Sequence, residues 1–203
     1  MRSPVLPAGD RQLIQIMDAA LADATRSSGP WLVCRPGCSQ CCVGVFAINQ
    51  LDTARLKSGF AELEQRDPAR AAAVRARSRD AAARFADNFP GDSRTGILAE
   101  DDSSEARFED FANDEICPVL DPSTGLCDLY ESRPMTCRTF GPPVRSEDGL
   151  GVCELCYHGA SDEEIATCEM EVDPDDLEGR LLRQVEAKTG TRGQTIIAFA
   201  LRD

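Results

Sequence analysis

Apolar positions between residues 10 and 26 recur with the period of an α-helix. They form one stripe made of Leu13, Ile14, Met17, Ala20, Leu21 and Ala24. Steps of three and four residues place these side chains on one face of a helix. Asp10 lies just before the stripe and is a residue type that caps helix N-termini, and Gly29-Pro30 follows the last turn. The pattern predicts an amphipathic first helix over residues 10–26, with Asp10 as its N-cap.

A longer segment, from Asp52 to Phe89, is rich in Ala, Arg, Leu and Glu, which are good helix formers. Asp67-Pro68 lies in its middle and combines an N-cap residue with a proline suited to the first helical position. We therefore expect a helical insertion over about residues 52–90, divided into two helices at this point.

The insertion also carries a run of arginines, namely Arg70, Arg75, Arg77, Arg79 and Arg84. Such a run can form an anion-binding face. The interspersed Asp residues and the acidic balance of the chain favour a solvated helix surface instead. No chemistry is therefore expected from the insertion.

Three other segments give weaker patterns. Residues 91–114 are acidic and polar with few apolar positions, which predicts a loop or a mobile lid. The apolar runs 43–48 and 195–201 are too short for periodicity to separate strand from helix. The first run can be a strand or a buried turn, and the second a strand or the end of a helix.

The last third of the chain contains two helix start signals. Ser161 followed by Glu164 forms a capping-box pattern. Asp173-Pro174 then opens a C-terminal helix over about residues 174–189. Its apolar stripe is made of Leu177, Leu181, Leu182 and Val185.

These elements and the composition together predict the fold class. The chain has 203 residues, of which 42% are hydrophobic and only 5% aromatic, so the hydrophobic core is modest for this length. A bound metal ion or a covalent cross-link would stabilise such a fold. We expect one small domain over residues 1–203, mainly α with irregular cysteine-rich loops, organised around a metal centre.

The net charge of −13 disfavours nucleic acid and anionic membranes as partners. The start of the sequence lacks the basic and apolar regions of a secretory signal, and no 18-residue apolar stretch occurs. We therefore expect a soluble cytoplasmic protein. In a reducing compartment, ten cysteines indicate metal binding or catalysis more often than five disulfides.

The cysteines fall into three groups along the chain. Cys34-x3-Cys38-x2-Cys41-Cys42 comes first, then three cysteines at intervals of ten residues, and then a Cys-x2-Cys pair. Short spacers allow neighbouring thiolates to converge on one metal centre, and Gly and Pro between them bend the chain. The later groups consist of Cys117, Cys127, Cys137, Cys153 and Cys156.

The adjacent pair Cys41-Cys42 is unusual, because neighbouring side chains diverge and both rarely bind one ion. The pair suits two metals, or one ligand and one packed thiol. Iron–sulfur and zinc sites both accept four thiolates. The surplus of thiols and the single histidine favour an iron–sulfur cluster of the 4Fe–4S type. Zinc is the alternative.

The chain resembles the YkgJ-type cysteine-cluster family in two segments. The first is Cys34-x3-Cys38-x2-Cys41-Cys42. The second is Cys-Pro-x-Leu followed by Gly-x-Cys-x-Leu-Tyr-Glu-x-Arg-Pro-x-x-Cys-Arg-x-Phe. The resemblance covers roughly Cys34 to Phe140 and implies a zinc- or iron-chelating domain. A similar cysteine arrangement occurs in flagellin lysine N-methylases. The resemblance implies as metal ligands Cys34, Cys38, Cys41, Cys42, Cys117, Cys127 and Cys137.

The Cys153-x2-Cys156 pair lies beyond the family pattern. It lacks the preceding strand and helix of a thioredoxin-like unit, so metal ligation is favoured over thiol redox chemistry and the pair joins the predicted ligands. His158 is weak evidence for a further ligand. Cys168, in an acidic helical stretch, is expected to be a packed or exposed free thiol.

Two arginines in the second segment admit two interpretations. Arg133 and Arg138 can compensate the negative charge of metal-bound thiolates. They can equally pair with the carboxylates of Glu131 or Asp128 for structural reasons.

The function predicted from these patterns is metal binding for electron transfer, sensing or metal handling. An accessory or catalytic component of a protein lysine methylation system is one alternative, and a structural zinc protein is another. Radical SAM enzymes share the Cys-x3-Cys-x2-Cys spacing but build a barrel from strand–helix units, which this chain lacks. An enzyme is thus less favoured, and a protein partner of unknown identity stays open.

Overall fold

Helices make up most of the regular structure in the computed structural model, which describes residues 6–146, 149–173 and 175–203. The α-helices are α1 (Asp10–Ser28), α2 (Gln50–Arg66), α3 (Pro68–Phe85), α4 (Asp102–Glu109), α5 (Met135–Thr139), α6 (Asp162–Thr167), α7 (Leu177–Thr189) and α8 (Ile197–Leu201). Short 3-10 turns are η1 (Gly29–Trp31), η2 (Gln40–Cys42) and η3 (Tyr130–Ser132). The strands form two antiparallel pairs, β1 (Gly91–Asp92) with β2 (Ile97–Leu98) and β3 (Val144–Ser146) with β4 (Gly149–Gly151). The predicted mainly α fold class is confirmed.

Helix α1 is amphipathic, as its apolar stripe predicts. Leu13 and Met17 are buried and pack with Leu181 of α7 in one hydrophobic cluster. The prediction that Asp10 is the N-cap is wrong, because the N-cap position belongs to Gly9. Asp10 is the first helical residue, and its carboxylate accepts a hydrogen bond of 2.7 Å from Nε of Arg55 in α2.

The predicted break between two helices at Asp67-Pro68 is confirmed. Helix α2 ends at Arg66, and the Asp67 side chain caps α3 by accepting a hydrogen bond of 3.0 Å from the backbone N–H of Arg70. Together the two helices account for the predicted insertion.

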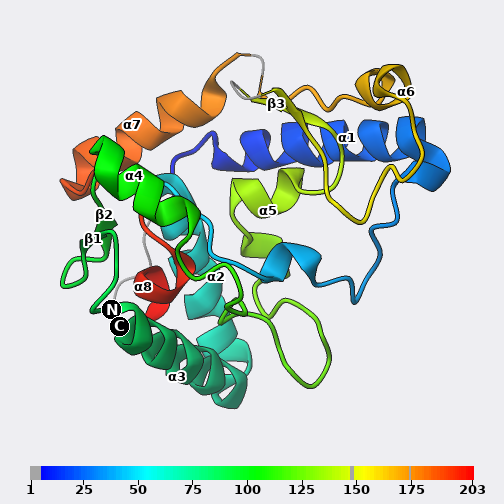
Figure 1. Cartoon of the computed structure of the whole chain (residues 1–203). Helices are drawn as coiled ribbons and strands as arrows, with labels where there is room; N and C mark the ends of the chain where they lie inside the picture. Colours follow the sequence, from blue (N-terminus) through cyan, green and yellow to red (C-terminus); the bar gives the residue numbers. More distant parts are fainter. Residues whose placement is uncertain (1–5, 147–148, 174) are drawn as a thin grey trace.

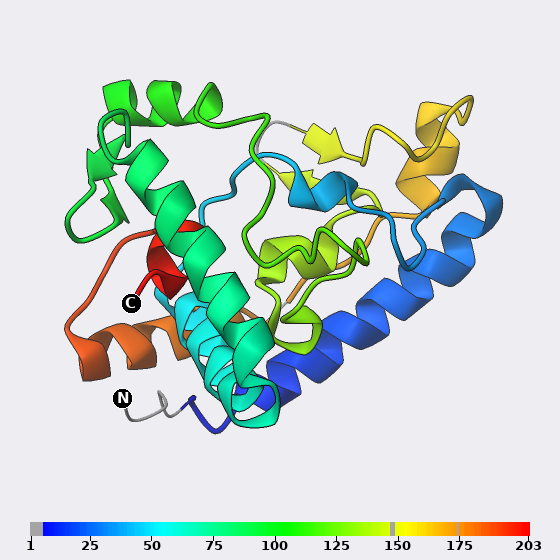
Figure 2. The same cartoon turned by 90° about the horizontal axis from the view of Figure 1, so that it is seen from below.

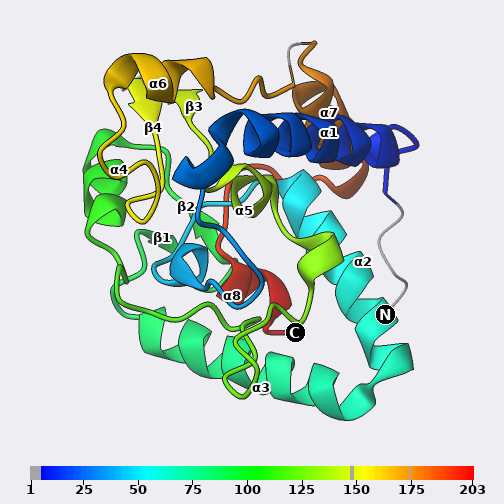
Figure 3. The ribbon, with the colours of Figure 1, turned by 90° about the vertical axis from the view of Figure 1, so that its right-hand side faces the viewer.

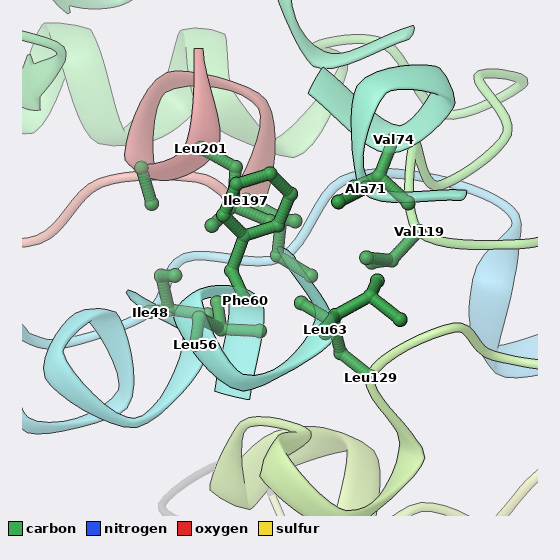
Figure 4. Packing of buried hydrophobic residues seen from close by; sticks show 11 residues of the cluster. Ile48, Leu56, Phe60, Leu63, Ala71, Val74, Val119, Leu129, Ile197 and Leu201 are labelled. Carbon is green, nitrogen blue, oxygen red and sulfur yellow. The ribbon is translucent and has the colours of Figure 1, made fainter. Parts of the chain in front are cut away.

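A hydrophobic core lies between α2, α3 and α8 and reaches into the second cysteine segment (Figure 4). Leu63 of α2 and Val74 of α3 face Val119 and Leu129, which flank the cysteine-bearing loop. Cys117 and Cys127 pack against the same core. The cysteine loop is therefore attached to a hydrophobic core of the fold.

The two short apolar runs adopt different structures. Ile48 forms an isolated antiparallel bridge with Thr195, so the first run is extended at its end without forming a regular strand. The second run continues from Thr195 into the buried helix α8.

The expectation of a loop or mobile lid over residues 91–114 is wrong. The segment contains the β1–β2 pair and helix α4, which is capped by the side chain of Asp101. Phe108 and Phe111 anchor the end of this segment, and the Phe111 ring lies 5.3 Å from the Phe85 ring of α3. These two aromatic side chains supply the burial that the polar composition obscures.

In the C-terminal part, the predicted capping box at the start of α6 is confirmed, with Ser161 and Glu164 as its members. Helix α7 begins at Leu177, three residues later than the predicted start, and Pro174 lies outside the described residues. The N-cap residue is Asp176, and the Asp173 carboxylate, three residues earlier, accepts hydrogen bonds from the backbone N–H groups of Leu177 and Glu178.

Helices α1 and α3 lie on opposite sides of the cysteine-bearing segments (Figures 1 and 3). Helix α6 lies beside the C-terminal end of α1, whereas α4 and the β1–β2 pair lie at the other end of the molecule (Figures 1 and 2). None of the helices in the described part of the chain has both the length and the apolar character needed to cross a bilayer.

Candidate metal centre

One open cavity of about 560 Å³ is lined by cysteines from three segments that lie far apart in the sequence. The lining cysteines are Cys34, Cys38, Cys41, Cys42, Cys117, Cys127, Cys137 and Cys153. Cys156 is buried, and its thiol interacts with those of Cys34 and Cys153. All ten cysteines of the chain are free thiols. The fold thus brings all nine candidate ligands to one cavity and its immediate border.

Mutual electrostatic interactions divide these nine thiols into two sets. The five-thiol group consists of Cys41, Cys42, Cys117, Cys127 and Cys137. The four-thiol group consists of Cys34, Cys38, Cys153 and Cys156. The first cysteine motif therefore contributes to both groups, which its sequence spacing did not reveal.

The backbone holds the five-thiol group together. The N–H of Cys117 donates to the carbonyl of Cys42 at 2.8 Å, which joins the first and second cysteine segments. Leu120 and Cys127 form an antiparallel bridge within the second segment. Cys137 lies on the short helix α5 and is the third contribution from this part of the chain.

Two arginines of α3 fix the second cysteine segment from outside. Arg70 and Arg77 both donate to the carboxylate of Asp128, whose side chain is only 1% exposed. Arg77 also donates to the carbonyl of Pro118 at 2.8 Å. Each acceptor directly follows a cysteine in the sequence. The expected solvated arginine face is therefore wrong for these two residues, which position the cysteine loop.

Burial and hydrogen bonding set the protonation of the five-thiol group. A hydrogen bond from the Cys42 thiol lowers the pKa of Cys41 to about 6, and the Arg133 guanidinium contributes to this. Burial raises the pKa of Cys117 to about 12 and also raises the pKa of Cys137. Cys41 is thus the thiol of this group that ionises most easily, while its buried neighbours must lose a proton to bind a metal.

Arg133 and Arg138 have different roles. Arg133 stacks over the Tyr130 ring at 3.9 Å and faces the cavity, which fits compensation of thiolate charge. Arg138 is buried and pairs with Asp18 of α1 at 2.8 Å. It also donates to the backbone carbonyl of Glu131, so the alternative in which it pairs with the carboxylate of Glu131 or Asp128 is wrong for Arg138.

Tight turns organise the four-thiol group. The N–H of Cys38 donates to the carbonyl of Arg35, and the N–H of Cys156 donates to the carbonyl of Cys153, both at 2.9 Å. The Cys34 pKa is raised to about 12, first by burial and then by the Cys156 thiol. Each turn therefore presents two thiols separated by two or three residues.

The two remaining candidates lie outside these groups. His158 is exposed in the turn that follows Cys156 and does not line the cavity. Cys168 is a buried free thiol that packs with Cys153, Cys156 and Tyr157, in line with the expectation of a packed thiol.

The donor set fits a thiophilic metal such as zinc or iron, because both accept several thiolates. The side chains do not yet form a coordination sphere. In the ranges 6–146, 149–173 and 175–203, no group of three or more Cys, His, Asp or Glu side chains is arranged so that it could hold a metal ion.

Comparison with known proteins agrees with the donor set. A family model named CxxCxxCC, described as "Putative zinc- or iron-chelating domain", matches residues 33–157, which is more than half of the chain. Neither a search of curated proteins nor a search of solved structures finds a match. The match confirms the predicted cysteine-cluster family and includes the Cys153–Cys156 turn, which the sequence pattern had placed beyond it. This protein belongs to the CxxCxxCC family of zinc- or iron-chelating domains.

Proposed function

We propose that this protein holds an iron–sulfur cluster, of the 4Fe–4S type, at the five-thiol group and serves in electron transfer, sensing or metal handling. The observation that carries the proposal is the convergence of five thiols, two of them adjacent in sequence, on a cavity of about 560 Å³ that three thiols of the four-thiol group also line. A single tetrahedral ion uses four thiolates and fills no such space. A 4Fe–4S cluster also takes four thiolates, one on each iron, but its bridging sulfides make it much larger than a single ion. The fifth thiol is then a packed neighbour, as the adjacent pair Cys41-Cys42 allows.

Backbone amides that favour the thiolate form support the same proposal. The backbone amides of Val119 and Leu120 act against the rise in the pKa of Cys117, and the amide of Leu129 does the same at Cys127. The N–H of Leu120 also donates to the carbonyl of Cys117 at 3.0 Å. Hydrogen bonds to cysteine sulfur stabilise the thiolate form and are one of the means by which proteins set the potential of iron–sulfur clusters. The amides are held in place because Val119 and Leu129 belong to the hydrophobic core.

The surroundings of the five-thiol group also suit a redox centre. Phe46, Phe140 and Leu126 line the cavity and exclude water from part of it. Arg133 supplies a positive charge that offsets the thiolates. When bound, the cluster would supply one-electron chemistry, and the residues of this chain would hold, shield and tune it.

Metal analysis of protein purified without oxygen tests the proposal. We expect iron and acid-labile sulfide together with broad visible absorbance, all lost in Cys117→Ser and Cys127→Ser. Cys168→Ser is the matched control, because Cys168 is buried and outside the five-thiol group. Colourless protein that contains only zinc at the five-thiol group would contradict the proposal and favour a structural zinc protein.

A further inference from the structure

We infer that the four-thiol group is a second metal site, separate from the five-thiol group, which binds one Zn²⁺ ion through Cys34, Cys38, Cys153 and Cys156. The inference does not depend on the nature of the centre at the five-thiol group. It rests on the geometry of two turns, on their close approach and on their separate attachment to the fold.

The ligand spacing is that of a closed tetrahedral site. One turn carries Cys34-x3-Cys38 and the other carries Cys153-x2-Cys156, and structural zinc sites use two such pairs with spacers of about two to four residues. Each turn is closed by its own backbone hydrogen bond, from Cys38 to Arg35 and from Cys156 to Cys153. Four thiolates complete the coordination of zinc and leave no position open.

The two turns already face each other. The Cys156 thiol interacts with the thiols of both Cys34 and Cys153, and Cys38 is an electrostatic neighbour of the same two residues. Gly141 lies between the turns, because its carbonyl accepts a hydrogen bond of 3.5 Å from the N–H of Cys153. A Cβ atom at Gly141 would fall 2.9 Å from the Cys34 sulfur. A side chain at Gly141 would displace the Cys34 thiol, and the φ of 124° at this position is one that residues other than glycine rarely adopt.

The four-thiol group is attached to a different part of the fold from the five-thiol group. Tyr157, directly after Cys156, donates its backbone N–H to the carbonyl of Trp31 at 2.9 Å. Its hydroxyl lies 2.5 Å from the hydroxyl of Ser28, at the end of α1. The buried cysteines of this turn form an apolar cluster of their own with Tyr157 and Cys168. The five-thiol group is instead held by α3 and the main core, so each group can close around a metal independently.

Zinc content of the full-length protein and its variants tests the inference. The protein is reduced, stripped of metal and titrated with Zn²⁺, and with Co²⁺ as a coloured probe of tetrahedral thiolate sites. We expect Cys153→Ser with Cys156→Ser to lose one equivalent of tightly bound zinc and to keep the iron of the anaerobically purified protein. Cys117→Ser should lose the iron and keep the zinc, and Cys168→Ser should keep both.

Gly141→Ala provides a test that removes no thiol. We expect at least a tenfold weaker affinity for zinc, measured by competition with a chelator, and unchanged iron content. Full zinc binding in the Cys153/Cys156 double variant would overturn the inference. So would equal loss of zinc and iron in variants of both groups that keep their circular dichroism, because that result indicates one shared centre. If zinc behaves as expected but iron is absent throughout, the second site stands and the proposed function fails.

Discussion

Replacing Asp128 by asparagine tests how α3 supports the cysteine loop. The Asp128 carboxylate is buried and accepts from both Arg70 and Arg77, whose side chains are 41% and 30% exposed. A hydrogen bond to a charged group contributes about 1.5–3 kcal/mol. Both arginines can regain water after the substitution, and asparagine still accepts one hydrogen bond, so we expect the free energy of unfolding to fall by about 2–3 kcal/mol.

Urea and thermal denaturation followed by circular dichroism measure this change. For a domain of this size, 1 kcal/mol corresponds to about 2–4 °C, so the midpoint should fall by about 4–12 °C. Glu64→Gln is the control, because Glu64 pairs with Arg75, another arginine of α3, and its side chain is 41% exposed. This substitution should lower the free energy of unfolding by less than about 1 kcal/mol. Equal losses in the two variants, or no loss in Asp128→Asn, would refute the assigned role of Asp128.

Further outcomes follow from buried groups and from close contacts. Burial raises the pKa of Asp52 from 3.8 to about 6, so the fold favours its neutral form, and stability should decline as pH rises from about 4 to 6. Asp52→Asn should flatten this part of the stability profile measured by urea denaturation. Gly59→Ala would place a Cβ atom 2.1 Å from the Ser132 hydroxyl, and a thermal melt should report a loss of about 1–3 kcal/mol. Large apolar side chains beside the cysteines, including Ile116 and Leu126, are exposed. Metal loading should draw these segments together and lower the fluorescence of the dye ANS, and an unchanged signal would count against such closure.

Local sequence patterns predict those helices whose start, end or buried face depends on side chains a few residues apart. The stripe of α1, the break at Asp67-Pro68 and the capping box at Ser161 all depend on side chains one or two turns apart. Residues 91–114 were misjudged because Phe108 and Phe111 are few among many polar positions. Their partner, Phe85, lies outside that segment.

The candidate site was predictable in its residue types and not in its arrangement. Spacing indicated candidate thiolate ligands, but the assignment of Cys38 and Cys41 to different groups depends on which distant turn each one faces. The support from Arg70 to Asp128 spans 58 residues, and neither residue differs in type from many solvated charges. Contacts of this kind come from the tertiary fold, which a single sequence does not show.

Mössbauer spectroscopy of ⁵⁷Fe-enriched protein, purified without oxygen, tests the central claim most directly. We expect the signature of tetrahedral, sulfur-coordinated iron in an exchange-coupled cluster, at about one cluster per chain, and its loss in Cys127→Ser. A protein in which iron is absent while zinc occupies the five-thiol group would contradict the claim.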